Sequence, residues 1–215
     1  MGADGWILVD RAKPAIRLIN SDGSDAEISG NGTRCAAALL VDAGFAGNDI
    51  DLQTGAGPKH LHLVSRKGKT FEFEMDMGSP EVREDTVIDG LRCLLLWVGN
   101  PQCAIVADSI PDTWVEIGRK LESHSRFPSR TNVSFVRAID RHTIEARFYE
   151  RGAGWTKSSG TGSTGAAFAA MHRGLVEPPV TVLTEAGPLA IRNNGTLLLT
   201  GPAEITARGE FFWNE

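Results

Sequence analysis

The stretch SGNGTRCAAALLVDAG, residues 29–44, recurs later in the chain as SGTGSTGAAFAAMHRG, residues 159–174. The serine, the two glycines that follow it, a pair of alanines and the closing glycine align without a gap. A single Gly-x-Gly match would carry little weight. A match of this length, which includes both ends of a helix, predicts an internal duplication.

Each copy follows the same local plan of strand, polar loop and helix. The runs AIRLI (15–19) and TIEARFYE (143–150) alternate apolar and polar residues, which is typical of half-buried strands. The serine stands where a helix N-cap belongs, and the closing glycine suits the left-handed position after a helix. The helices between them are small and apolar on nearly every side, which predicts that they are buried.

Short strand-like runs surround the two helices. They cover residues 51–54, 60–65, 70–77, 91–98, 103–107, 131–138, 180–186, 189–193 and 196–201. This pattern predicts an α+β fold of two pseudo-symmetric β-rich lobes, each wrapped round a central buried helix. Turn residues near position 78 favour a boundary there. The predicted N-terminal lobe comprises residues 1–76 plus 206–215, and the C-terminal lobe residues 77–205.

The second copy is preceded by a longer segment than the first. Asn100, in the run WVGNPQC, precedes Ser159 by more residues than the chain has before Ser29. The first lobe therefore has no counterpart of those opening strands and their helix. This pattern favours a chain that is a fragment, or whose start was assigned too late, over a natively reduced lobe.

The composition excludes several classes of function. A net charge of -5 without a basic run argues against a nucleic-acid partner. No apolar segment approaches the roughly 18 residues of a membrane span, and no secretory signal pattern occurs. Three cysteines without paired spacing favour a reducing compartment, so we expect a cytoplasmic protein. The histidines show no metal-ligand pattern and no nucleotide-binding motif occurs, so we expect neither metal nor cofactor.

The two helix starts favour a ligand with an anionic group. The first turn of a helix carries unpaired N–H groups and a partial positive charge, and glycine lets a ligand approach that backbone closely. If the duplicated halves face each other, both helix starts converge on one carboxylate and stabilise charge that develops on it. Ser29 and Ser159 then flank the carbon next to that carboxylate from opposite faces. This geometry suits removal of a proton from one face and delivery to the other.

Five segments together resemble the diaminopimelate epimerases. They are GADGWILV (2–9), INSDGSDAEISGNGTRC (19–35), VGNPQC (98–103), TNVSFV (131–136) and ERGAGWTKSSGTGSTGAA (150–167). The resemblance implies the two-lobed fold described above and cofactor-independent inversion of an α-carbon, from LL- to meso-diaminopimelate. It also implies a small amino-acid ligand and a homodimer.

The resemblance further implies roles for named residues. The distal amino-acid end of the substrate would be held by Asn20, Asn100, Asn132, Glu150 and Arg151. In this set the Arg151 guanidinium would grip a carboxylate and Glu150 would pair with an ammonium. The amides that receive the reacting carboxylate would come from the two helix starts, at Gly30, Asn31, Gly160 and Thr161.

The chain departs from the family at the two catalytic positions. The resemblance implies a cysteine base in each half, but the residues here are Ser29 and Ser159. An alcohol is a weaker acid than a thiol by about five pKa units, which would slow proton transfer by about five orders of magnitude. Cys35 lies in the second helix turn, where we expect it not to replace either base. Lys157 is the nearest candidate in sequence for a helper base, and we expect it to be a solvated loop lysine.

Two further departures are Gln102, where the family has histidine, and Trp155, where it has glutamate.

The sequence leaves three interpretations open: an epimerase whose serines were introduced to disarm it, a naturally divergent isomerase or dehydratase of the proline racemase-like superfamily, or an amino-acid-binding pseudoenzyme. Of these, epimerase lineage with impaired turnover fits the motifs best.

Overall fold

The computed structural model describes residues 5–210, which form three helices and fifteen strands. The helices are α1 (Gly30–Asp42), α2 (Trp114–Glu122) and α3 (Gly160–His172). The strands are β1 (Gly5–Asp10), β2 (Ala15–Asn20), β3 (Asp25–Ala26), β4 (Asp49–Thr54), β5 (Gly57–Lys67), β6 (Thr70–Asp76), β7 (Glu81–Ile88), β8 (Leu91–Trp97), β9 (Pro101–Val106), β10 (Asn132–Asp140), β11 (Thr143–Glu150), β12 (Gly154–Thr156), β13 (Val180–Thr184), β14 (Gly187–Asn193) and β15 (Leu197–Glu204). The strand-rich mixed fold with few helices is confirmed.

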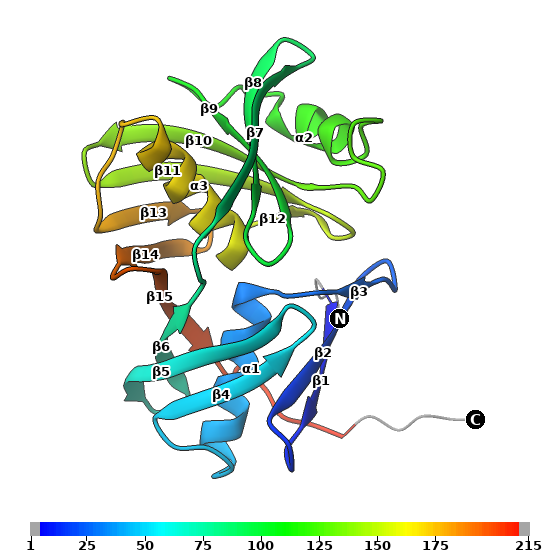
Figure 1. Ribbon diagram of the computed structural model, residues 1–215. Coiled ribbons are helices and arrows are strands. Elements are labelled where there is room, and N and C mark those ends of the chain that lie inside the picture. The colour runs from blue at the N-terminus through cyan, green and yellow to red at the C-terminus, as the bar shows by residue number, and fades with distance from the viewer. Residues whose placement is uncertain (1–4, 211–215) are drawn as a thin grey trace.

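The strands are hydrogen-bonded in the order β1-β2-β4-β5-β6-β15-β14-β13-β11-β10-β9-β8-β7, with β3 on β2 and β12 on β11. Most neighbours are antiparallel, whereas β2–β4, β9–β10 and β11–β13 are parallel. Figure 1 shows β1–β6 gathered round α1 and β7–β14 gathered round α3, with β15 running between the two groups. Because β15 pairs with both β6 and β14, it joins the two halves through backbone hydrogen bonds.

Helices α1 and α3 have the caps and burial that their sequences predict. Ser29 and Ser159 are the N-caps, and each side chain accepts a hydrogen bond from the backbone N–H three residues later. The closing residues Gly44 and Gly174 have φ of 75° and 69°, the left-handed conformation that glycine adopts without a steric penalty. Alanines on several sides of both helices are inaccessible to solvent, so both helices are buried in the main apolar core.

Strands β1 and β7 have no counterpart in the sequence expectations, and α2 is the helix expected, without bounds, in the longer segment before the second motif. Strand β7 lies at an edge of the sheet, and its residues Val82 and Val87 are exposed. Its apolar residues therefore do not line up on one buried face, which is the pattern that predicts a strand. Helix α2 is short and covers a separate small core that includes Leu121 and Phe135. No helix among residues 5–210 is long and apolar enough to cross a membrane. Residues 1–4 and 211–215, which belong to the expected N-terminal lobe, lie outside the described residues.

Candidate active site

The starts of α1 and α3 are in direct backbone contact. A Cβ atom added at Gly30 would lie 2.7 Å from the Cα of Gly160, and one added at Gly160 would lie 2.6 Å from the Cα of Gly30. Real Cβ atoms do not approach other atoms this closely, so both positions require glycine for packing. The convergence of the two helix starts that the repeat predicts is therefore present.

A buried arginine braces the first turn of α1. Arg34 is 3% exposed and donates to the carbonyl of Gly30 at 3.2 Å, to Oδ1 of Asn31 at 2.8 Å and to the carbonyl of Pro202 in β15 at 3.2 Å. Burial lowers the pKa of Arg34 to about 10, which still leaves the guanidinium charged at neutral pH. The Asn31 amide in turn donates to the carbonyl of Ser158, just before α3, at 2.9 Å. The two helix starts are thus tied together by side chains as well as by the glycine contact.

The variant Arg34→Met is expected to lower the free energy of unfolding by about 2 kcal/mol, because one buried and two partly buried acceptors lose their donor while the methionine fills much of the volume. Cys35→Ser is the control, because this neighbouring side chain is exposed and its replacement should change stability by less than about 0.5 kcal/mol. Urea unfolding followed by circular dichroism measures both values. Equal stability of Arg34→Met and the wild type would contradict a bracing role.

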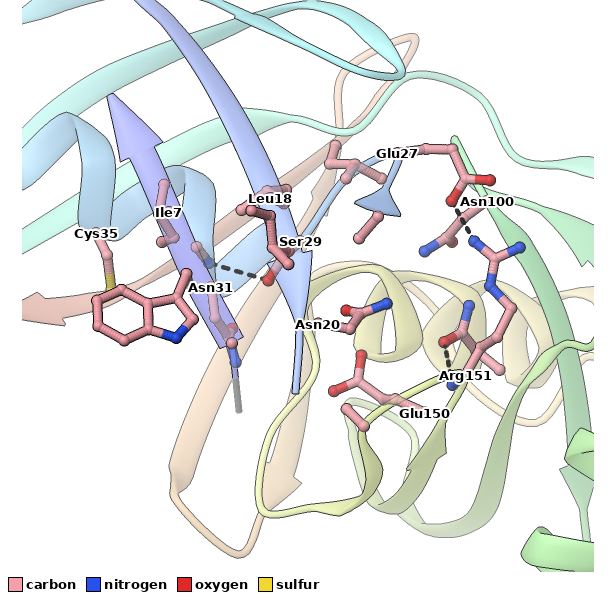
Figure 2. Close-up of a pocket in the computed structure, with 18 of the residues that line it drawn as sticks. Ile7, Leu18, Asn20, Glu27, Ser29, Asn31, Cys35, Asn100, Glu150 and Arg151 are labelled. Carbon is pink, nitrogen blue, oxygen red and sulfur yellow. Dashed lines mark hydrogen bonds and ion pairs between the residues drawn. The ribbon is translucent and has the colours of Figure 1, made fainter. Parts of the chain in front are cut away.

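A cavity of about 210 Å³ lies beside the joined helix starts. Its lining comes from both halves of the chain and includes seven of the expected site residues: Asn20, Ser29, Asn31, Asn100, Asn132, Glu150 and Arg151. Figure 2 labels six of these seven side chains, all except Asn132, round one space. The other four expected residues, Gly30, Ser159, Gly160 and Thr161, are buried next to it and are absent from the lining among the described residues.

The two serines differ in their surroundings. Ser29 is half-buried and lines the cavity, and its hydroxyl accepts from the Gly32 N–H at 3.0 Å. Ser159 is 3% exposed, and its hydroxyl donates to Oε2 of Glu150 at 2.7 Å. The other Glu150 oxygen accepts from the Thr156 hydroxyl at 2.6 Å. One serine therefore has a carboxylate ready to take its proton, and the hydroxyl of the other faces the cavity and accepts from a backbone amide.

Buried amides form a network behind the cavity. Nε2 of Gln102 donates to Oδ1 of Asn100 at 2.6 Å and to the hydroxyl of Thr161 at 3.2 Å. Asn132 donates to the carbonyl of Pro101 at 2.9 Å and accepts from the backbone N–H of Arg151 at 3.0 Å. These bonds fix the orientation of two expected ligand-holding asparagines before a ligand arrives. Gln102 thus remains connected to the site, although Oε1 of this side chain has no partner among the described residues.

Arg151 makes an ion pair across the cavity. Its guanidinium donates to the Glu27 carboxylate, which comes from the loop before α1 in the other half of the chain, as the dashed line in Figure 2 marks. The Arg151 side chain is 15% exposed and that of Glu27 is 39% exposed. Removing either partner of this pair would leave the other charge partly desolvated and unpaired, which costs free energy.

Sequence reasoning missed Glu27 and Thr156. Glu27 stands two residues before Ser29, and only the fold brings it to Arg151. Cys35 lines the same cavity as Ser29, and the expectation that it does not replace either base stays a prediction. Lys157 is exposed and Trp155 donates to Glu185 at 2.8 Å, and neither lines the cavity. No group of three or more potential metal ligands occurs in residues 5–210.

Comparisons with known proteins identify relatives of the whole chain. The family model described as diaminopimelate epimerase matches residues 95–206. A diaminopimelate epimerase of Acetivibrio thermocellus is 35% identical over 240 aligned residues, which cover 100% of this chain and 86% of the relative. One of Bacteroides thetaiotaomicron is 35% identical, with 98% of this chain and 83% of the relative covered. The chain belongs to the diaminopimelate epimerase family. It is therefore an isomerase by lineage, as its motifs indicate.

Solved structures of low sequence identity share the fold. A hydroxyproline epimerase from Agrobacterium vitis superposes with a TM-score of 0.74 at 19% identity, over 94% of this chain and 73% of that one. A phenazine biosynthesis protein from Bacillus anthracis gives a TM-score of 0.66 at 11% identity, over 94% of this chain and 82% of that one. At these identities the likeness concerns the fold alone.

Proposed function

We propose that this protein is a cofactor-independent amino-acid epimerase that interconverts LL- and meso-diaminopimelate, a precursor of lysine and peptidoglycan. The observation that carries the proposal is the meeting of two glycine-rich helix starts beside a cavity lined from both halves. Membership of the diaminopimelate epimerase family supports the choice of substrate.

In the proposed complex, the reacting carboxylate lies at the helix starts, where partial positive charge favours it and stabilises charge that develops on it. The side chains of Asn20, Asn100 and Asn132 surround the rest of the substrate, and Arg151 binds the distal carboxylate. The asparagine amides are already oriented by their own hydrogen bonds, so less ordering is required on binding.

Proton transfer occurs at the two faces of the α-carbon. On one face, Ser29 is the group that exchanges a proton with the substrate. On the other face, the Ser159 oxygen takes the α-proton while its own proton passes to Glu150. Ser29 gives its hydroxyl proton to the opposite face of the α-carbon, and exchange with water then returns a proton to Ser29 and removes the one held by Glu150. Hydroxyls are poor bases compared with thiolates, so we expect slow turnover.

The chain as it stands is expected to bind LL-diaminopimelate and to exchange its α-proton slowly. The test is incubation with LL- or meso-diaminopimelate in D₂O, with deuterium incorporation followed by mass spectrometry and binding by calorimetry. Exchange above the protein-free control supports the proposal. Binding without exchange favours the second candidate, an amino-acid-binding pseudoenzyme. The serines at both base positions support this candidate, because hydroxyls are poor bases. Absence of both binding and exchange contradicts the substrate assignment.

We also propose that the two halves are pseudo-symmetric products of duplication, with the lobes bounded as residues 1–76 plus 206–215 and 77–205. The matched lengths and serine caps of α1 and α3 support this. A homodimer in the cytoplasm is part of the same proposal, and light scattering of the purified chain tests the oligomeric state.

A further inference from the structure

The charged groups of the cavity are unequal in number. Among the described residues that line it, one cation, Arg151, stands with two carboxylates, Glu27 and Glu150. A diaminopimelate end carries one carboxylate and one ammonium. Binding of that end therefore requires a cation and a carboxylate that can both turn to the ligand.

Glu150 is already engaged in the site, because both of its oxygens accept short hydrogen bonds, from Ser159 and from Thr156. If the Glu150 carboxylate rotated to face a ligand ammonium, the buried Ser159 hydroxyl would lose its acceptor, which costs free energy. Glu27 has a different position. Its carboxylate lies in the cavity, is partly exposed, and is held by the same guanidinium that the ligand carboxylate needs.

The backbone of Glu27 is also fixed. The turn between β4 and β5 packs against it so closely that a Cβ at Gly55 would lie 2.9 Å from the Glu27 carbonyl oxygen. The side chain can change rotamer from this fixed point, while its Cα stays at the cavity wall. Because its backbone is fixed and its side chain can change rotamer, the Glu27 carboxylate can leave Arg151 and bind a ligand at the cavity wall.

We propose that Glu27 recognises the ammonium of the distal amino-acid end, an inference that rests on the proposed function. The ligand carboxylate replaces Glu27 on Arg151, and the ligand ammonium replaces Arg151 on Glu27. One ion pair becomes two, so Arg151 and Glu27 each keep a partner of opposite charge. A dicarboxylate without amino groups would take Arg151 and leave Glu27 unpaired beside it, so the pair selects zwitterionic ends. Glu27 thus takes the role that the family resemblance gives to Glu150.

The test compares the affinities of LL-diaminopimelate and pimelate by calorimetry. Each molecule has two identical ends, so the direction of binding does not affect the result. We expect Glu27→Gln to reduce the preference for LL-diaminopimelate over pimelate by about 30-fold, near the lower limit for loss of one member of a desolvated charge pair. The contribution of the proximal ammonium is the same in both proteins and cancels.

Asp22→Asn is the matched control, since Asp22 also pairs across the halves, with Arg130 at 3.2 Å, but does not line the cavity. This variant should leave the preference unchanged. Circular dichroism and thermal unfolding establish that each variant is folded.

An unchanged preference for LL-diaminopimelate over pimelate in Glu27→Gln, or loss of that preference in Glu150→Gln instead, overturns the inference while the proposed function stands. If LL-diaminopimelate binds without proton exchange, the proposed reaction fails and the 30-fold change still supports Glu27. If the wild type does not bind LL-diaminopimelate, both are overturned.

Discussion

Replacing Ser29 and Ser159 together by cysteine is expected to raise the rate of α-proton exchange on diaminopimelate by about five orders of magnitude. A thiol has a pKa near 8.5, and the positive end of a helix lowers it further, so a usable fraction is thiolate at neutral pH. An alcohol is weaker as an acid by about five pKa units, which corresponds to roughly 7 kcal/mol. The helix dipoles recover only about 1–2 kcal/mol of this difference.

The single variants should differ, because the serines have different partners. Ser159 already has Glu150 to accept its proton, whereas the Ser29 hydroxyl accepts from a backbone amide. Ser29→Cys alone should therefore raise exchange more than Ser159→Cys alone. Deuterium incorporation measured by mass spectrometry gives all four rates, and a parallel series with Cys35→Ser excludes a contribution from that cavity thiol. Equal rates for the wild type and the double variant would refute the assignment of these two positions as the proton-transfer groups.

Adding one methyl group at Gly160 is expected to lower the free energy of unfolding by about 3 kcal/mol and any turnover by about 100-fold. The new Cβ would lie 2.6 Å from the Gly30 Cα and 3.1 Å from its carbonyl carbon. Both are backbone atoms of a buried helix, so relief requires the two helix starts to separate. That separation moves the groups on either face of the substrate. Chemical denaturation and the exchange assay measure the two effects.

Gly165→Ala is the control within the same helix, because its Cβ would meet its nearest neighbours at an ordinary 3.6–3.7 Å. Alanine favours helix over glycine, so this variant should be as stable as the wild type or more stable, by up to about 1 kcal/mol. Gly30→Ala should resemble Gly160→Ala, and the double variant should cost less than the sum, because either methyl group alone opens the same contact. Full additivity of the two losses would show that the glycines act independently, against the contact described here.

The helix ends and the buried helices of this protein could be predicted from the sequence without the structure. The capping serines, the glycines after α1 and α3, and the burial of both helices depend on residues within a few positions of each other. Strand periodicity and the polar ends of β2 and β11, Asn20 and Glu150, could be predicted for the same reason. The duplicated motif also indicated that two helix starts would meet. The edge strand β7 was not predicted, and the bounds of the short helix α2 were not assigned.

The tertiary structure alone decided how the site residues share the cavity. The Glu27–Arg151 pair joins residues from different halves, and no spacing in the sequence encodes it. The same holds for Ser159, which is turned to Glu150 behind the cavity while its repeat partner Ser29 faces into it. Local sequence fixes the conformation of each segment. The contacts between segments depend on how the two halves pack and on which rotamers that packing allows, and these are set by interactions among residues distant in the chain.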